Sequence, residues 1–161
     1  MLRIFQPDEI GPTANDLRPT IRQCLKQWQS KITEQQARLT LDLSVPLPVL
    51  CQAEDTHPLI HGLLELAVKR LVPDGELSVI GCRTAGAVEL EIADTGPQLP
   101  CESKQIRWLF PPRVLADSRQ LAGLQPQAIA FGGRVWATPC PQGGMAWTLR
   151  LPSRATIKRA A

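Results

Sequence analysis

The sequence predicts an α/β sandwich of two layers, in which three helices cover one face of a mixed, mainly antiparallel β-sheet. Two observations carry this prediction. Several segments alternate apolar and polar residues with the period of a strand that is buried on one face. Two long segments repeat apolar residues every three or four positions, as helices packed on a sheet do, and a third helix is expected from residue 117 onward.

Composition limits the classes of protein to which the chain can belong. It has 161 residues, of which 43% are apolar and 20% charged, and a formal net charge of +3. These values suit one globular domain with a single core. Neither an apolar run of roughly 18 residues nor a signal-peptide pattern occurs, so we expect a cytoplasmic protein without a membrane span. Part of the weak basic bias lies in the tail, which does not indicate a nucleic-acid partner.

The predicted organisation is an N-terminal arm over residues 1–13, one domain over residues 14–152 and a basic tail over residues 153–161. The first helix is expected over residues 16–36, with Asn15 or Asp16 as its cap. Residues 38–43 alternate, with three leucines on one face, and predict a strand. Two prolines hold residues 46–52 extended.

A second helix is predicted over residues 56–71, and its apolar stripe is too wide for one exposed face, so it must be largely buried. A turn follows at residues 73–75. Residues 76–82 and 87–93 alternate on either side of a loop that contains a glycine, which is the pattern of a β-hairpin. This hairpin ends at Asp94.

The segment 88–98 reads Val-Glu-Leu-Glu-Ile-Ala-Asp-Thr-Gly-Pro-Gln, a strand that runs into a carboxylate and a glycine turn. Turn chemistry alone would explain it. The order of the surrounding segments, however, makes it resemble the Asp-x-Gly-x-Gly box of the GHKL, or Bergerat-fold, ATPases, and most closely that of sensor histidine kinases. In that family the Asp accepts a hydrogen bond from the adenine amino group. The resemblance assigns Asp94 and Gly96 to nucleotide binding, while Gln98 replaces the second Gly.

The second helix resembles the N box of the family, whose pattern is Asn-Leu-Leu-x-Asn-Ala-x-Lys. Here residues 62–69 read Gly-Leu-Leu-Glu-Leu-Ala-Val-Lys. Gly62 and Leu66 replace the two Asn, and leucine offers no oxygen to magnesium. Lys69 matches the family position that often approaches the phosphates, although a solvated helix end would also explain it.

The remaining motifs resemble the family in their secondary structure but not in the residues that would bind phosphate. Residues 106–112 resemble the F box, but residues 113–124 contain one glycine and cannot form the glycine-rich phosphate loop that follows it in active kinases. From Asp117 the chain reads as ordinary helix, with Pro126 kinking it or starting a new turn. Residues 128–152 resemble the kinase ending of helix, Gly-Gly, strand, glycine turn and strand, with Ala146 where the family often has Thr.

Cysteine and histidine add no separate site. The five cysteines are widely spaced without a CxxC pair and are expected to be reduced thiols. His57 and His61 lie four residues apart on the second helix, but no third ligand is evident, so no metal site is predicted.

The resemblance implies three functional hypotheses. The first is a degenerate histidine-kinase-like domain without catalytic residues, which serves two-component-type signalling as a regulatory or scaffolding module with a protein partner. The second is a divergent but active histidine kinase or ATPase that binds ATP or ADP through Asp94, Gly96 and Lys69. The third is a binding module whose former nucleotide cleft accepts another ligand or a protein segment. The loss of the magnesium Asn and of the phosphate loop favours the first hypothesis.

Overall fold

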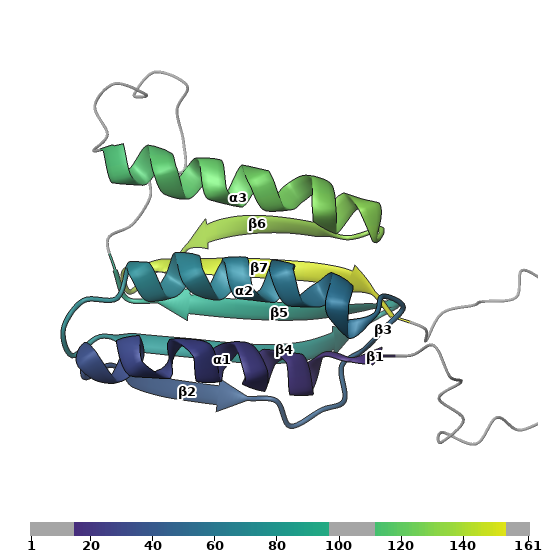
Figure 1. Cartoon of the computed structure of the whole chain (residues 1–161), viewed down its shortest axis with the longest axis horizontal. Coiled ribbons are helices and arrows are strands. Elements are labelled where there is room, and N and C mark those ends of the chain that lie inside the picture. The colour runs from purple at the N-terminus through teal and green to yellow at the C-terminus, as the bar shows by residue number, and fades with distance from the viewer. Residues whose placement is uncertain (1–14, 97–111, 154–161) are drawn as a thin grey trace, which may run out of the picture.

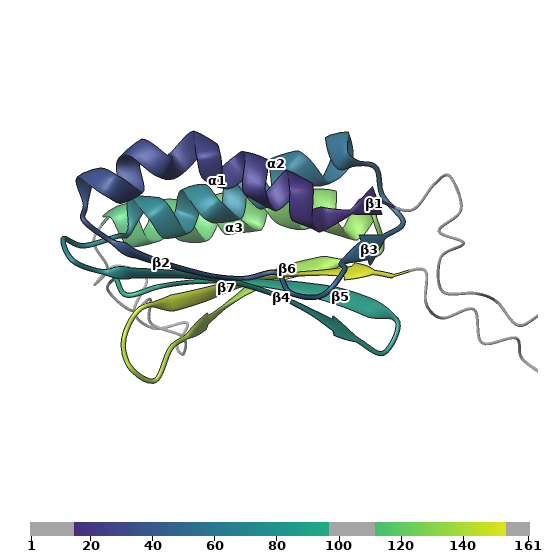
Figure 2. The same ribbon diagram turned by 90° about the horizontal axis from the view of Figure 1, so that it is seen from below.

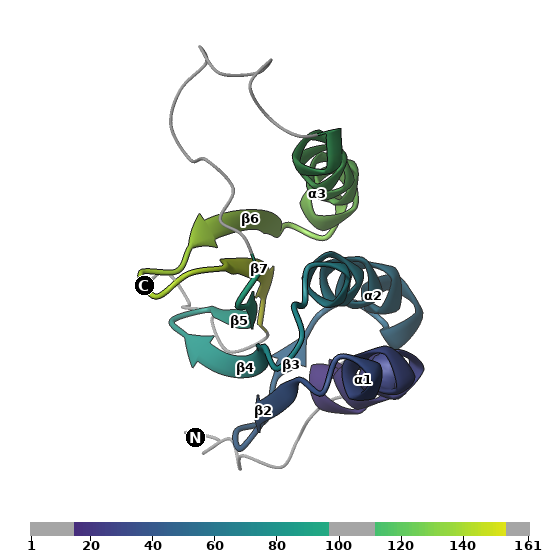
Figure 3. The ribbon, with the colours of Figure 1, turned by 90° about the vertical axis from the view of Figure 1, so that its left-hand side faces the viewer.

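The computed structural model describes residues 15–96 and 112–153 (Figure 1). Three helices form one layer and a five-stranded sheet forms the other (Figures 2 and 3). The sheet has the order β2-β4-β5-β7-β6, in which only β2 and β4 are parallel neighbours. The predicted fold class is therefore confirmed, while the proposed arm and most of the tail lie outside the described residues.

The helices are α1 (Leu17–Glu34), α2 (Ala53–Lys69) and α3 (Pro112–Ala130). The sheet consists of β2 (Arg38–Asp42), β4 (Glu76–Thr84), β5 (Ala87–Asp94), β6 (Arg134–Pro139) and β7 (Met145–Pro152). Two short strands, β1 (Asn15–Asp16) and β3 (Pro48–Val49), pair antiparallel outside this sheet. None of the helices in the described part of the chain is long and apolar enough to cross a membrane.

The core lies between α2 and the central strands. The apolar residues of β5 that alternate in the sequence, Val88, Leu90 and Ile92, are all buried, as are Trp147 and Leu149 of β7. The edge strand β2 has only one neighbour, which leaves its two leucines, residues 39 and 41, 42% and 40% exposed. The core is thus centred on β5 and β7, and Asp94 is the last residue of β5.

The predicted helices are present with shifted ends. Helix α2 begins at Ala53 rather than at residue 56, because Asp55 accepts a hydrogen bond from the backbone N–H of Gln52 and caps the helix earlier. Helix α3 includes Asp117, as predicted, and continues through Pro126, so the alternative in which Pro126 starts a new turn is wrong. The interval between the F-box-like segment and the Gly-Gly pair is therefore largely helical; the F-box-like segment itself lies almost entirely outside the described residues.

Asp16 caps α1, which selects one of the two predicted caps. Its carboxylate accepts hydrogen bonds from the backbone N–H groups of Arg18 and Leu47, at 3.1 and 3.2 Å, and pairs with the Arg18 side chain. Burial acts to raise the pKa of Asp16, but the hydrogen bonds from Arg18 and Leu47 outweigh it and hold the pKa below its ordinary value. The carboxylate therefore joins the start of α1 to the segment before β3.

Replacing Asp16 with alanine is expected to lower the free energy of unfolding by about 1–2 kcal/mol at pH 7, the usual cost of losing an N-cap. Because the folded-state pKa of Asp16 lies below the unfolded one, its charged form stabilises the fold above the unfolded value, and this contribution disappears as pH falls through the folded pKa. Urea unfolding at pH 7 and near pH 2.5 should show the difference between Asp16→Ala and wild type shrinking in acid. An equal difference at both pH values would contradict this role for the charge.

Candidate functional site

Asp94 stands at the end of the central strand β5 and is buried on the helix side of the sheet. One carboxylate oxygen, Oδ1, accepts the backbone N–H of Gly96 at 2.8 Å. The other, Oδ2, accepts Nε of Arg70 at 3.2 Å and the indole N–H of Trp147 at 2.8 Å. The Asp94 side chain is 0% exposed, so in this arrangement both of its oxygens are engaged by the protein itself.

Arg70 follows the last residue of α2 and is the centre of this network. It is 4% exposed, and its Nη1 donates to Asp117 of α3 at 3.2 Å. Its guanidinium lies 5.6 Å from the centre of the Trp147 ring. The third nitrogen, Nη2, is buried and has no hydrogen-bond partner among the residues that the structure describes. One cation thus connects α2, β5, β7 and α3.

The balance of charges in this network determines how much it stabilises the fold. Arginine suits such a position because its planar guanidinium offers several donors in a fixed fork and is weakly hydrated. A buried ion pair adds little net stability, because the ions lose their hydration, but removing one partner leaves the other charged and unpaired. The Arg70 network therefore holds Asp94 in place, and its members are costly to change one at a time.

The face of α2 that corresponds to the N box is used for helix packing. Gly62 lies against Leu124 of α3, and a Cβ atom at position 62 would be 2.8 Å from the Leu124 side chain. Leu66 is completely buried. Beside them, the Gln120 side chain donates to Glu65 at 2.9 Å. Helices α2 and α3 are thus in direct contact at Gly62, the first of the two positions that correspond to Asn in the N box, while Leu66 at the second position is buried.

The two other predicted nucleotide-binding residues have structural surroundings of their own. A Cβ atom at Gly96 would lie within 3.0 Å of the backbone oxygen of Arg70, so glycine lets the turn after β5 pass against the end of α2. Lys69 is half-exposed and forms an ion pair with Glu65 one turn earlier. The structure places Asp94 and Gly96 together in one turn, with Lys69 at the end of the neighbouring helix.

Sequence reasoning missed Arg70, Asp117 and Trp147 as parts of the site. A signal was present for Arg70, because it extends the buried stripe of Leu59, Leu63 and Leu66 at spacings of four, three and four residues. A charged residue in register with a buried stripe indicates a buried counter-charge. The sequence alone could not identify that partner.

The two histidines lie together on α2. The rings of His57 and His61 stack with centroids 5.9 Å apart. Within the described residues no cluster of three or more histidine, cysteine, aspartate or glutamate side chains could hold a metal ion. Burial raises the pKa of Cys24 to about 11, so this thiol stays protonated near neutral pH.

The sequence of this chain is similar to those of sensory kinases. No protein-family model matches the chain. The adaptive-response sensory kinase SasA of Synechococcus elongatus is 27% identical over 135 residues, which cover 79% of this chain and 35% of that kinase. SasA of Gloeothece citriformis is 34% identical over 93 residues, or 56% of this chain and 23% of that kinase. The chain thus matches only part of the length of these curated relatives.

Solved structures share the fold over most of the chain. The catalytic domain of histidine kinase ThkA has a TM-score of 0.68 and 16% identity, covering 88% of this chain and 96% of that domain. ThkA in complex with response regulator protein TrrA has a TM-score of 0.69 and 17% identity, covering 89% of this chain and 42% of that one. Full-length ShkA in complex with AMPPNP has a TM-score of 0.67 and 22% identity, covering 86% of this chain and 30% of that one.

These similarities agree with the order of the motifs along the chain and with the two-layered structure. The alternating hairpin that ends at Asp94, the N-box-like helix and the glycine turn before the last strand all occupy one sheet and its helical cover. The resemblance read from the sequence is confirmed at the level of the fold: this chain has the fold of the catalytic domain of histidine kinases.

Proposed function

We propose that this chain is a histidine-kinase-like domain that acts through a protein partner in two-component-type signalling, and that its nucleotide binding is weak or lost. The similarity to SasA and the fold support the signalling role. The complex of ThkA with a response regulator supports a protein of that class as the partner. The observation that carries the loss of nucleotide binding is the pairing of Asp94 with Arg70.

Adenine would have to compete with donors that already belong to the protein. In the family the Asp accepts a hydrogen bond from the adenine amino group, whereas here Arg70 and Trp147 both donate to Oδ2 of Asp94. Separating Arg70 from Asp94 would leave the buried guanidinium with Asp117 as its only ion-pair partner among the described residues, and breaking such a buried pair is costly. A neutral amino group cannot replace the charge that is lost.

The surroundings of α2 also disfavour phosphoryl transfer. Magnesium in nucleotide sites is held by oxygen ligands, and phosphoryl transfer depends on its charge. Gly62 and Leu66 supply no side-chain oxygen, and both are buried under neighbouring elements. These positions suit a domain that works by binding a partner rather than by catalysis.

Calorimetric titration with ATP and ADP, each with and without magnesium, tests this proposal. We expect binding to the wild-type chain to be absent or weaker than about 1 mM, which corresponds to about 4 kcal/mol of binding free energy. Asp94→Ala should not change the result, and neither should the exposed control Asp42→Ala. Magnesium-dependent binding that Asp94→Ala abolishes would overturn the proposal in favour of an active kinase or ATPase. Tight binding that needs Asp94 but ignores magnesium would instead indicate an adenine sensor.

A further inference from the structure

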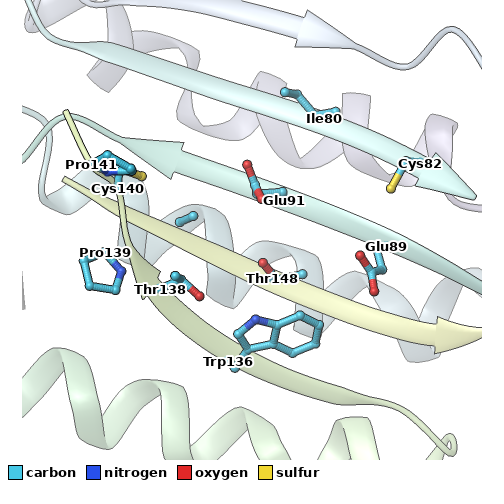
Figure 4. Close-up of a pocket in the computed structure, with 11 residues that line it drawn as sticks. Ile80, Cys82, Glu89, Glu91, Trp136, Thr138, Pro139, Cys140, Pro141 and Thr148 are labelled. Atoms are coloured by element: carbon cyan, nitrogen blue, oxygen red, sulfur yellow. The ribbon is translucent and has the colours of Figure 1, made fainter. Parts of the chain in front are cut away.

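The sheet face opposite the three described helices is concave (Figure 2). The β4–β5 and β6–β7 hairpins both bend away from the helical layer (Figure 2). Between them lies a groove of about 370 Å³, lined by side chains of β4, β5, β6, β7 and the turn after β6 (Figure 4). This groove lies on the opposite side of the sheet from Arg70 and Asp94.

The strand register shows how the groove is built. Trp136, Thr148, Glu91 and Ile80 are paired in one row across four strands. Thr148 in the middle of this row is 5% exposed, although no described helix covers this face. Trp136 and the turn at Pro139 and beyond line the same groove on one side. The floor is therefore shielded by walls that are largely apolar.

Among the described residues, two charged side chains line the groove, Glu89 and Glu91. Arg150 and Glu89 form an ion pair of 2.6 Å. The guanidinium of Arg134 lies 4.6 Å from the centre of the Trp136 ring. Glu91 is exposed at the centre of the row and forms no ion pair with any residue that the structure describes. A ligand would therefore meet one available carboxylate between apolar walls.

Two cysteine thiols, Cys82 and Cys140, lie on opposite sides of the groove and close enough to Glu91 to feel its charge. Burial raises the pKa of Cys82, and the carboxylates of Glu89 and Glu91 raise it further. Burial also raises the pKa of Cys140, and the carboxylates of Glu91 and Asp94 raise it further. The charge of Glu91 thus acts on both walls, where it would favour a cation.

We propose that this groove binds an arginine side chain presented by a segment of a partner protein, with Glu91 accepting the guanidinium. The choice of occupant rests on charge complementarity and shape. An arginine can lay its apolar stem along Trp136 and the proline wall while its planar end bonds a carboxylate through two parallel hydrogen bonds. Arginine binding in this groove does not depend on whether the Asp94 site, on the other face of the sheet, binds a nucleotide.

The test is a titration of the isotope-labelled chain with a capped pentapeptide, serine-valine-arginine-valine-serine, followed by amide and indole chemical shifts. We expect shifts at Trp136, Thr148 and Glu91. The same peptide with neutral citrulline in place of arginine should bind about tenfold more weakly, because its urea N–H groups carry no positive charge to strengthen the hydrogen bonds to the carboxylate. Glu91→Gln should weaken the arginine peptide by a similar factor.

The matched control is Glu34→Gln, which removes one exposed carboxylate from the helical layer and should leave peptide binding unchanged. Glu91 is exposed, so its substitution is expected to leave the fold intact, and the citrulline comparison needs no variant at all. Equal binding of both peptides would overturn the proposal, and so would full binding by Glu91→Gln. The absence of shifts in the groove at several millimolar peptide would overturn it as well.

Discussion

Replacing Arg70 with methionine is expected to lower the free energy of unfolding by about 3–5 kcal/mol, the usual cost of breaking a buried ion pair from one side. The substitution keeps an unbranched apolar stem but removes the guanidinium that donates to Asp94 and Asp117. Both carboxylates, 0% and 8% exposed, would then lose their ion pair. Urea unfolding followed by Trp fluorescence measures the loss.

A matched control and a compensating variant distinguish the charge network from a general effect of losing an arginine. Arg38→Met removes an arginine whose ion pair with Glu76 is exposed, and it should cost about 0–1 kcal/mol. Adding Asp94→Asn and Asp117→Asn to Arg70→Met removes the unpaired charges and should recover part of the stability. If Arg70→Met costs no more than Arg38→Met, the buried network does not hold these elements together.

Replacing Gly144 with alanine is expected to lower the free energy of unfolding by about 2–5 kcal/mol, the sum of backbone strain and overpacking. Gly144 has a φ of +84°, and a Cβ atom there would lie within 3.0 Å of the backbone oxygen of Asp94. The neighbour is backbone in the central strand, so it cannot move aside as a flexible side chain would. The substitution should therefore also disturb the hydrogen bond that Trp147, three residues after Gly144, donates to Asp94.

Gly143 provides the matched control for this prediction. Its φ is also positive, at +103°, but a Cβ atom there would meet no other atom within 4 Å. Gly143→Ala should therefore carry only the backbone strain, about 1–2 kcal/mol. Thermal unfolding of both variants, with near-ultraviolet circular dichroism of the Trp residues, measures the difference. Equal losses would mean that the close approach of the turn to Asp94 has no energetic consequence.

The sequence by itself determined the order of the elements and most of the buried faces. Alternation and helical spacing are local properties, so β5, β7 and α2 could be read from a few neighbouring residues. The same is true of what α2 lacks, because Gly62 and Leu66 have no ligand oxygen in any fold. The position of Asp94 at the end of a buried strand followed from the alternation that precedes it.

Only the tertiary structure decided what Asp94 contacts and which sheet face stays uncovered. The partners of Arg70 lie 24 and 47 residues away along the chain, and no local pattern specifies a contact between groups so far apart. The groove around Glu91 likewise depends on two hairpins that bend away from the helices (Figure 2). Periodicity shows which side of a strand is apolar. Contacts between distant segments, however, arise only when separate elements pack, because burial and charge pairing are satisfied across the whole fold rather than along the chain.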